Sequence, residues 1–210
     1  GHVTIGRMLV VRHGESTWNA VRRWQGQADP PLSDRGESQA RRGALAAPEH
    51  GSFDAIVTST LQRAYRTGEL IASALDVPLL NPVSELSERS AGEWEGLTRA
   101  EIEQSFPGYL DEDRRPVGYE SDASIVKRSS RALQRLAADQ ASRTLLVISH
   151  GGIIHALERA HSDDDGWRRL DNLTGRWFDV TPTRILPIGN RIALVPDGGP
   201  AIPPPETGYA

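Results

Sequence analysis

Two short apolar runs in this chain end in the same way, and this repetition constrains the fold more than any other feature of the sequence. Residues 8–11 lead into Arg12-His13-Gly14, and residues 144–149 lead into His150-Gly151. Short apolar runs rich in β-branched side chains are typical of strands that are buried on both faces of a sheet. The pattern therefore predicts two buried strands, each of which carries a histidine to its carboxyl end.

Strand and helix signals alternate along the rest of the chain. Helices are predicted over 34–46, from a cap at Ser59 or Thr60 to about 75, over 98–106, over 121–139 and over 153–161. Short extended segments are predicted over 53–58, 78–80, 83–86, 176–180 and 184–195. The order predicts an α/β fold with three layers, α/β/α, and a mainly parallel central sheet. The last two segments could add an antiparallel edge strand, with Gly189-Asn190 as a hairpin signal.

The helix predicted over 121–139 has one apolar and one basic face. Its basic side chains are expected to face solvent, and they are Lys127, Arg128, Arg131 and Arg135.

Length and composition fit one domain. The chain has 210 residues, of which 38% are hydrophobic and 25% are charged, which suits a soluble globular protein with a sizeable core. We expect a single domain over residues 8–195. Residues 1–7 are expected to be an N-terminal extension whose Gly1-His2 is a remnant of an expression tag. The Pro- and Gly-rich residues 196–210 are expected to form a C-terminal tail.

Composition also excludes several kinds of partner. The net charge of −4 argues against nucleic acid, and no apolar stretch is long enough to cross a membrane. The chain has no Cys, which rules out disulfides and thiolate metal sites. Because no signal-peptide pattern is present either, a cytoplasmic location is expected. Monomer and homodimer both remain open.

Several charged side chains follow separate predicted strands, and in a parallel sheet they would meet in one crevice. Two histidines and two arginines with one carboxylic acid make a poor metal site but a good phosphate site, so no metal is expected. The glycines that follow the histidines, including Gly151, permit a close approach of the phosphate. These side chains are Arg12, His13, Arg63, Glu88 and His150. From the residues alone, His13 could be a metal ligand, a general base, a nucleophile or merely a strand cap.

Four motifs in this order resemble the histidine phosphatase superfamily, in its phosphoglycerate mutase-like branch, over about residues 8–180. They are Arg12-His13-Gly14-Glu15 with Asn19, Ser59-x-x-x-Arg63-Ala64, Leu86-x-Glu88, and Ser149-His150-Gly151. The resemblance implies a phosphoglycerate mutase-like fold in which His13 is the phosphorylated nucleophile and Glu88 is the proton donor. It also implies that Arg12, Arg63 and His150 cradle the phosphoryl group. Asn19 is implied to contact the phosphate, with Arg23, Gln25 and Gly26 at the substrate entrance.

The expected activity is that of a phosphomonoesterase that needs no metal or cofactor and hydrolyses a small phosphorylated metabolite through a phosphohistidine. A cofactor-dependent phosphoglycerate mutase is the alternative, since Arg114-Arg115 could grip a substrate carboxylate as basic residues do in mutases. Such mutases carry a longer insertion between the acid and the second histidine, whereas Glu88 and His150 are 62 positions apart here. A non-catalytic phosphate-binding or interaction protein on the same fold is a third reading. For the acid itself, the rivals of Glu88 are Glu85, Glu93 and Glu95.

Overall fold

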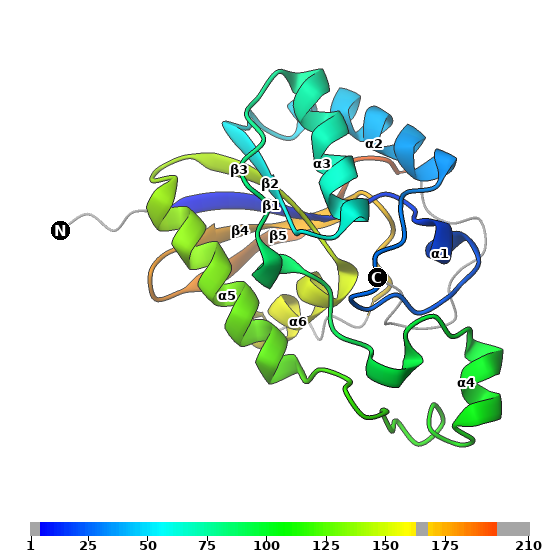
Figure 1. Ribbon diagram of the computed structural model, residues 1–210. Helices are drawn as coiled ribbons and strands as arrows, with labels where there is room; N and C mark the ends of the chain where they lie inside the picture. Colours follow the sequence, from blue (N-terminus) through cyan, green and yellow to red (C-terminus); the bar gives the residue numbers. More distant parts are fainter. Residues whose placement is uncertain (1–4, 163–167, 197–210) are drawn as a thin grey trace.

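The centre of the fold is strand β1 (Gly6–Arg12), which has neighbours on both sides in a five-stranded sheet of order β2-β3-β1-β4-β5. The computed structural model describes residues 5–162 and 168–196 (Figure 1). On one side β1 pairs in parallel with β3 (Thr144–Ser149), and β3 pairs in parallel with β2 (Ala55–Thr58). On the other side β4 (Thr174–Val180) and then β5 (Ile185–Ala193) are antiparallel to their neighbours.

Helices cover both faces of the sheet, which gives the predicted three layers (Figure 1). On one face, Leu9 and Val11 of β1 pack in a cluster with α2 (Asp34–Ala46) and α3 (Gln62–Leu75). On the other face, Met8 and Val10 pack in a second cluster with α5 (Asp122–Asp139) and α6 (Gly151–His161). Because successive side chains of a strand point to opposite faces, one apolar run supplies both cores. The predicted fold class is confirmed.

A third, smaller apolar cluster lies beyond the carboxyl side of the sheet. Its buried members are Trp24, Ala91, Trp94 and Ile102. It is built from short pieces: a single turn of 3₁₀ helix over Gly92–Trp94, helix α4 (Arg99–Ser105) and the loops that follow α1 (Thr17–Ala20) and α4. In Figure 1, α4 lies at the outer edge of the molecule, away from the layered core. We call the segment from Ala91 to Tyr119 the cap.

Side-chain caps begin most helices where the sequence predicts them. Ser33 and Ser121 cap α2 and α5, and Thr98 forms a capping box with Glu101. The predicted cap of α3 is wrong. That helix begins after Leu61, whose side chain cannot cap it: the Ser59 hydroxyl is bound to His150, and the amide of Gln62 donates to the side chain of Asp29, at 2.7 Å.

Two predicted extended segments also differ from the structure. Ser84–Leu86 forms a 3₁₀ turn rather than a strand, and the segment over 78–80 contributes only one bridge, between Leu79 and Ile56. The Gly189-Asn190 pair does not form a hairpin turn: β5 runs through it, and the turn lies between Thr181 and Arg184. Gly189 has φ +62° where the β4–β5 register shifts, so the glycine accommodates an irregular strand.

The predicted ends of the chain fall mostly outside the described residues, which exclude 1–4 and 197–210; β1 begins at Gly6, inside the predicted extension. No helix within residues 5–162 and 168–196 is long and apolar enough to cross a membrane.

Candidate active site

His13 lies directly after β1 and is completely buried. Its Nδ1–H donates to the carbonyl oxygen of Gly14, at 2.6 Å. Nε2 accepts a hydrogen bond from Nε of Arg63, at 3.3 Å. Since a carbonyl only accepts and a guanidinium only donates, the ring is held as the Nδ1–H tautomer. The lone pair of Nε2, the atom that could act as a nucleophile, therefore points toward Arg63.

The backbone around His13 is fixed from three sides. The amide of His13 donates to Ser149 of β3, and its carbonyl accepts from the side chain of Asn172, at 3.0 Å. A Cβ at Gly14 would lie 2.6 Å from the carbonyl oxygen of Gly36, so only glycine permits this approach to α2. No local sequence pattern predicts a role for Asn172, because its partner is 159 residues away.

Two buried arginines flank the histidine. Arg12 donates to the carbonyl of Leu170 at 2.6 Å, while Arg63 donates to those of Ala28 and Gly26, at 2.7 and 2.8 Å. Burial lowers the pKa of each to about 10, so both remain charged at neutral pH. Because these bonds go to main-chain carbonyls, they orient the guanidinium groups without cancelling their charge. Two fixed positive charges beside Nε2 suit a phosphoryl dianion.

His150 stands at the amino end of α6, with its ring centroid 5.1 Å from that of His13. Its Nε2 is 2.7 Å from the hydroxyl of Ser59, which accepts from the Leu61 amide. A hydroxyl can donate one hydrogen bond and accept two, so this contact fits either tautomer of the ring. Burial, with the charge of Arg63, holds the pKa of His150 well below its ordinary value. His150 is therefore neutral, and its buried Nδ1 has no hydrogen-bond partner among the described residues.

Glu88 is buried against the first turn of α6. Its Oε1 accepts from the amide of Arg89 at 2.6 Å, and its Oε2 accepts from the amide of Gly152 at 3.1 Å. Burial raises the pKa of Glu88, although the two amides oppose this shift. A raised pKa suits a group that has to donate a proton.

The three rival glutamates are placed differently. Glu85 pairs with Arg135 at the surface, Glu93 is exposed, and Glu95 accepts from the amides of Gln27 and Ala91. Of the four, Glu88 is the one that contacts the helix headed by His150.

Arg128 corrects one prediction: it does not face solvent, although Lys127, Arg131 and Arg135 are exposed as expected. It donates to the carbonyls of Glu85, Ser87 and Glu88, at 2.8, 2.6 and 3.0 Å. It also pairs with the carboxylate of Glu120, at 2.8 Å. Helical periodicity places Arg128 on the outer face of α5, but the loop that carries Glu88 covers that part of the face. Arg128 thereby fixes the main chain of the candidate acid.

The remaining predicted site residues lie near this centre with other partners. Asn19 accepts from the amide of Ser16, and Gln25 is buried and accepts from the Ser16 hydroxyl. Arg23 donates to the Gly96 carbonyl and pairs with Glu101. Gly26 supplies a carbonyl to Arg63, and Gly151 is the buried first residue of α6. The roles of these residues toward a substrate stay predictions.

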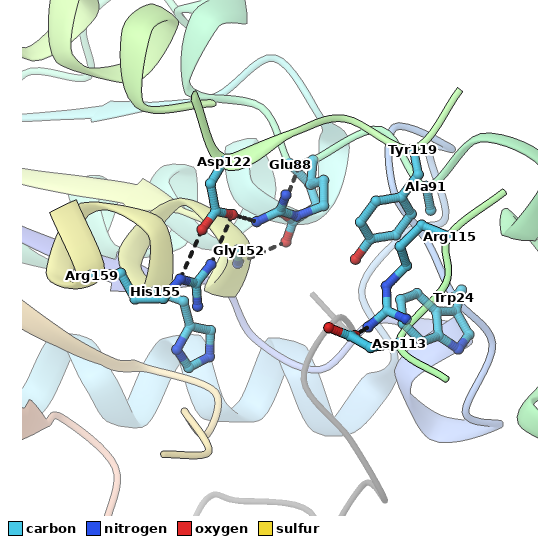
Figure 2. A pocket seen from close by; sticks show the side chains of 11 residues that line it. Trp24, Glu88, Ala91, Asp113, Arg115, Tyr119, Asp122, Gly152, His155 and Arg159 are labelled. Carbon is cyan, nitrogen blue, oxygen red and sulfur yellow. Dashed lines mark hydrogen bonds and ion pairs between the residues drawn. The ribbon is translucent and has the colours of Figure 1, made fainter. Parts of the chain in front are cut away.

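A cleft of about 200 Å³ opens beside Glu88 (Figure 2). Glu88 and Gly152 line its inner end, and the cap contributes Arg115 and Tyr119. The described residues contain no group of three or more His, Asp or Glu that could hold a metal ion.

Comparison with known proteins agrees with this geometry. The family model of the histidine phosphatase superfamily (branch 1) matches residues 8–183. Phosphoglycerate mutase-like protein 4 of Arabidopsis thaliana is 33% identical over 166 residues, which cover 75% of this chain and 72% of that protein. Glucosyl-3-phosphoglycerate phosphatase of Mycobacterium tuberculosis is 32% identical over 167 residues, with 73% and 74% covered.

A solved structure of a mycobacterial glucosyl-3-phosphoglycerate phosphatase, in complex with VO3, superimposes with a TM-score of 0.70. It is 28% identical and covers 82% of this chain and 90% of that one. The chain therefore belongs to the histidine phosphatase superfamily, as its four motifs predicted, and is an enzyme of the phosphatase class.

Proposed function

We propose that the chain is a metal-independent phosphomonoesterase that hydrolyses a small phosphorylated metabolite through a phosphohistidine at His13. The observation that carries this proposal is the tautomer of His13: Nδ1 donates to Gly14, so the lone pair of Nε2 points toward the guanidinium of Arg63, a group that suits a phosphate. A cytoplasmic location and a small phosphorylated partner belong to the same proposal.

In the first step, Nε2 of His13 attacks the phosphorus atom and the bond from phosphorus to the ester oxygen breaks. The electron pair of that bond goes to the leaving alkoxide, which takes the proton of the Glu88 carboxyl group. The Gly14 carbonyl accepts from Nδ1–H and so stabilises the charge that the phosphorylated ring gains. Arg12, Arg63 and His150 would bind the equatorial oxygens, where negative charge must be stabilised during transfer.

In the second step, water replaces the alcohol. The Glu88 carboxylate takes a proton from this water, whose oxygen attacks phosphorus. The bond from phosphorus to Nε2 breaks and returns its electron pair to His13, which releases inorganic phosphate. One carboxyl group thus serves as acid and then as base, which matches its mixed environment of burial and two amide donors.

Turnover of p-nitrophenyl phosphate in excess EDTA tests the proposal, with His13→Ala as the inactive control. We expect wild-type turnover to persist in EDTA. Loss of activity on chelation, with recovery on adding a divalent metal, would contradict a metal-independent reaction.

The product that forms distinguishes a phosphatase from a mutase. Given 3-phosphoglycerate and its bisphosphate, the enzyme should release inorganic phosphate faster than it forms 2-phosphoglycerate. Arg114 and Arg115 form ion pairs with their own neighbours Glu112 and Asp113. This pairing supports hydrolysis, because both arginines already have a carboxylate partner within the chain. A dominant isomer product would establish the mutase instead.

A further inference from the structure

The cleft beside Glu88 is where a leaving group has to lie. Glu88 must reach the ester oxygen, so the rest of the alcohol extends from Glu88 and Gly152 into the space that they line. Figure 2 shows this space between two walls, one formed by Asp122, His155 and Arg159 and the other by Asp113, Arg115 and Tyr119. Its volume is about 200 Å³. A small alcohol fits.

On the first wall, the cations already share a carboxylate. Asp122 accepts two hydrogen bonds from Arg159, both at 2.9 Å, and it also pairs with Arg89. Arg89 further donates to the carbonyl of Glu120, at 2.6 Å. Nδ1 of His155 lies 3.4 Å from the guanidinium of Arg191.

On the second wall, the cap supplies a cation together with its own counter-ion. Arg115 pairs with Asp113 at 3.1 Å and lies over the rings of Trp94 and Tyr119, at 5.3 and 5.5 Å. The neighbouring Arg114 pairs with Glu112 and lies over Tyr109, at 4.2 Å, and it does not line the cleft.

Among the residues that the structure describes, every cation of the lining is therefore already paired. With Glu88 protonated for its role as acid, three arginines face two aspartates, and each arginine has a carboxylate partner. An incoming carboxylate would have to displace Asp113 or Asp122, or lie beside them, and like charges repel even at the solvent-exposed mouth of the cleft, where these two side chains lie. Hydroxyl groups need no displacement, because each can donate to an aspartate and accept from an arginine.

We infer that the leaving group is an uncharged alcohol rich in hydroxyl groups, such as a polyol or a sugar, and that the cleft selects against phosphate esters that carry a carboxylate. This inference rests on the proposed function and narrows its substrate class. Selectivity of this kind comes from the penalty on the wrong ligand as much as from contacts to the right one.

Two phosphate esters make a matched test. Glycerol 3-phosphate and 3-phosphoglycerate have the same carbon skeleton and differ in one group, a CH₂OH or a carboxylate. We expect kcat/KM to be about 5-fold higher for glycerol 3-phosphate, mainly through KM, because the repulsion between two like charges about 4 Å apart in water has that size. The ratio should fall at high ionic strength, since salt screens charges near the surface.

Asp113→Asn tests whether Asp113 causes the preference for glycerol 3-phosphate over 3-phosphoglycerate. The substitution removes one carboxylate and leaves Arg115 uncompensated, so KM for 3-phosphoglycerate should fall several-fold while glycerol 3-phosphate is little affected. Asp113 has φ +55°, a conformation that asparagine also adopts, so the loop should keep its shape. Glu112→Gln is the control: its partner Arg114 lies outside the cleft, and the ratio should not change.

An equal or higher kcat/KM for 3-phosphoglycerate would overturn the inference, and so would an unchanged ratio in Asp113→Asn. The proposed function would stand in either case, provided that p-nitrophenyl phosphate is hydrolysed through His13. A wild-type enzyme that hydrolyses none of the three esters would overturn both.

Discussion

Gly152→Ala should disable the acid while leaving the fold intact. A Cβ at position 152 would lie 2.1 Å from Oε1 of Glu88, whereas such contacts essentially never fall below 3.0 Å. The carboxyl group must therefore retreat by about 1 Å, and it loses the bond from the Gly152 amide. Alanine forms helices better than glycine, so α6 itself should not be destabilised.

The size of the loss follows from the role of Glu88. General acid catalysis contributes about 10²- to 10⁴-fold, and a displacement of about 1 Å can cost about 10²-fold. Only poor leaving groups need the proton, so an alkyl phosphate should lose about 10²-fold in kcat/KM. Phosphoenzyme formation from p-nitrophenyl phosphate should lose far less.

Burst kinetics with p-nitrophenyl phosphate and steady-state kinetics with an alkyl phosphate measure the two losses, and thermal unfolding checks the fold. Gly51→Ala is the matched control, because its Cβ would only touch the ring of Trp177, at 3.4 Å. Equal losses on both substrates, or no loss on either, would refute the placement of Glu88 as the acid.

Three further predictions follow from the same contacts. Glu88→Gln should slow an alkyl phosphate far more than the p-nitrophenyl phosphate burst, and equal losses would mean that Glu88 only positions the phosphate. Arg128→Met should also slow an alkyl phosphate more than p-nitrophenyl phosphate, by a smaller factor than Glu88→Gln, and should add little further loss of activity to Glu88→Gln. Arg131→Met is the control and should behave as wild type. Equal losses of activity on both substrates in Arg128→Met would mean a purely structural role. Because the pKa of buried His150 is lowered from 6.5, the unfolded chain binds its proton first, so the free energy of unfolding should fall as pH drops below about 6.5. Urea titrations of wild type and His150→Gln at several pH values between about pH 7.5 and about pH 5.5 test this. The free energy of unfolding should fall less with pH in His150→Gln, and an equal fall in both proteins would contradict the prediction.

Local pattern predicted those parts of the fold that depend on local energetics. The helices over Asp34–Ala46 and Asp122–Asp139 match their predicted ranges closely, and the strand over Thr144–Ser149 matches its apolar run. In these segments, periodicity, capping residues and burial all favour the same structure.

Two of the wrong predictions, at Ser59 and Arg128, share one physical cause, a tertiary partner that local pattern does not encode. Serine is a common helix-capping residue, but the hydroxyl of Ser59 is bound to His150, 91 residues away. Arg128 has the spacing of a solvated residue, yet three carbonyls from the Glu88 loop lie over it. The motif Ser59-x-x-x-Arg63 did contain a signal for Ser59, whereas Asn172 and Arg128 had none.

Trapping of the phosphoenzyme tests the central claim most directly. Rapid quench of wild type during turnover of a ³²P-labelled alkyl phosphate should yield a phosphoenzyme that is labile in acid and stable in alkali, with the label on His13. The same species should form in EDTA and be absent from His13→Ala. An acid-stable, alkali-labile phosphoenzyme with the label on Ser16, or label retained by His13→Ala, would contradict the account.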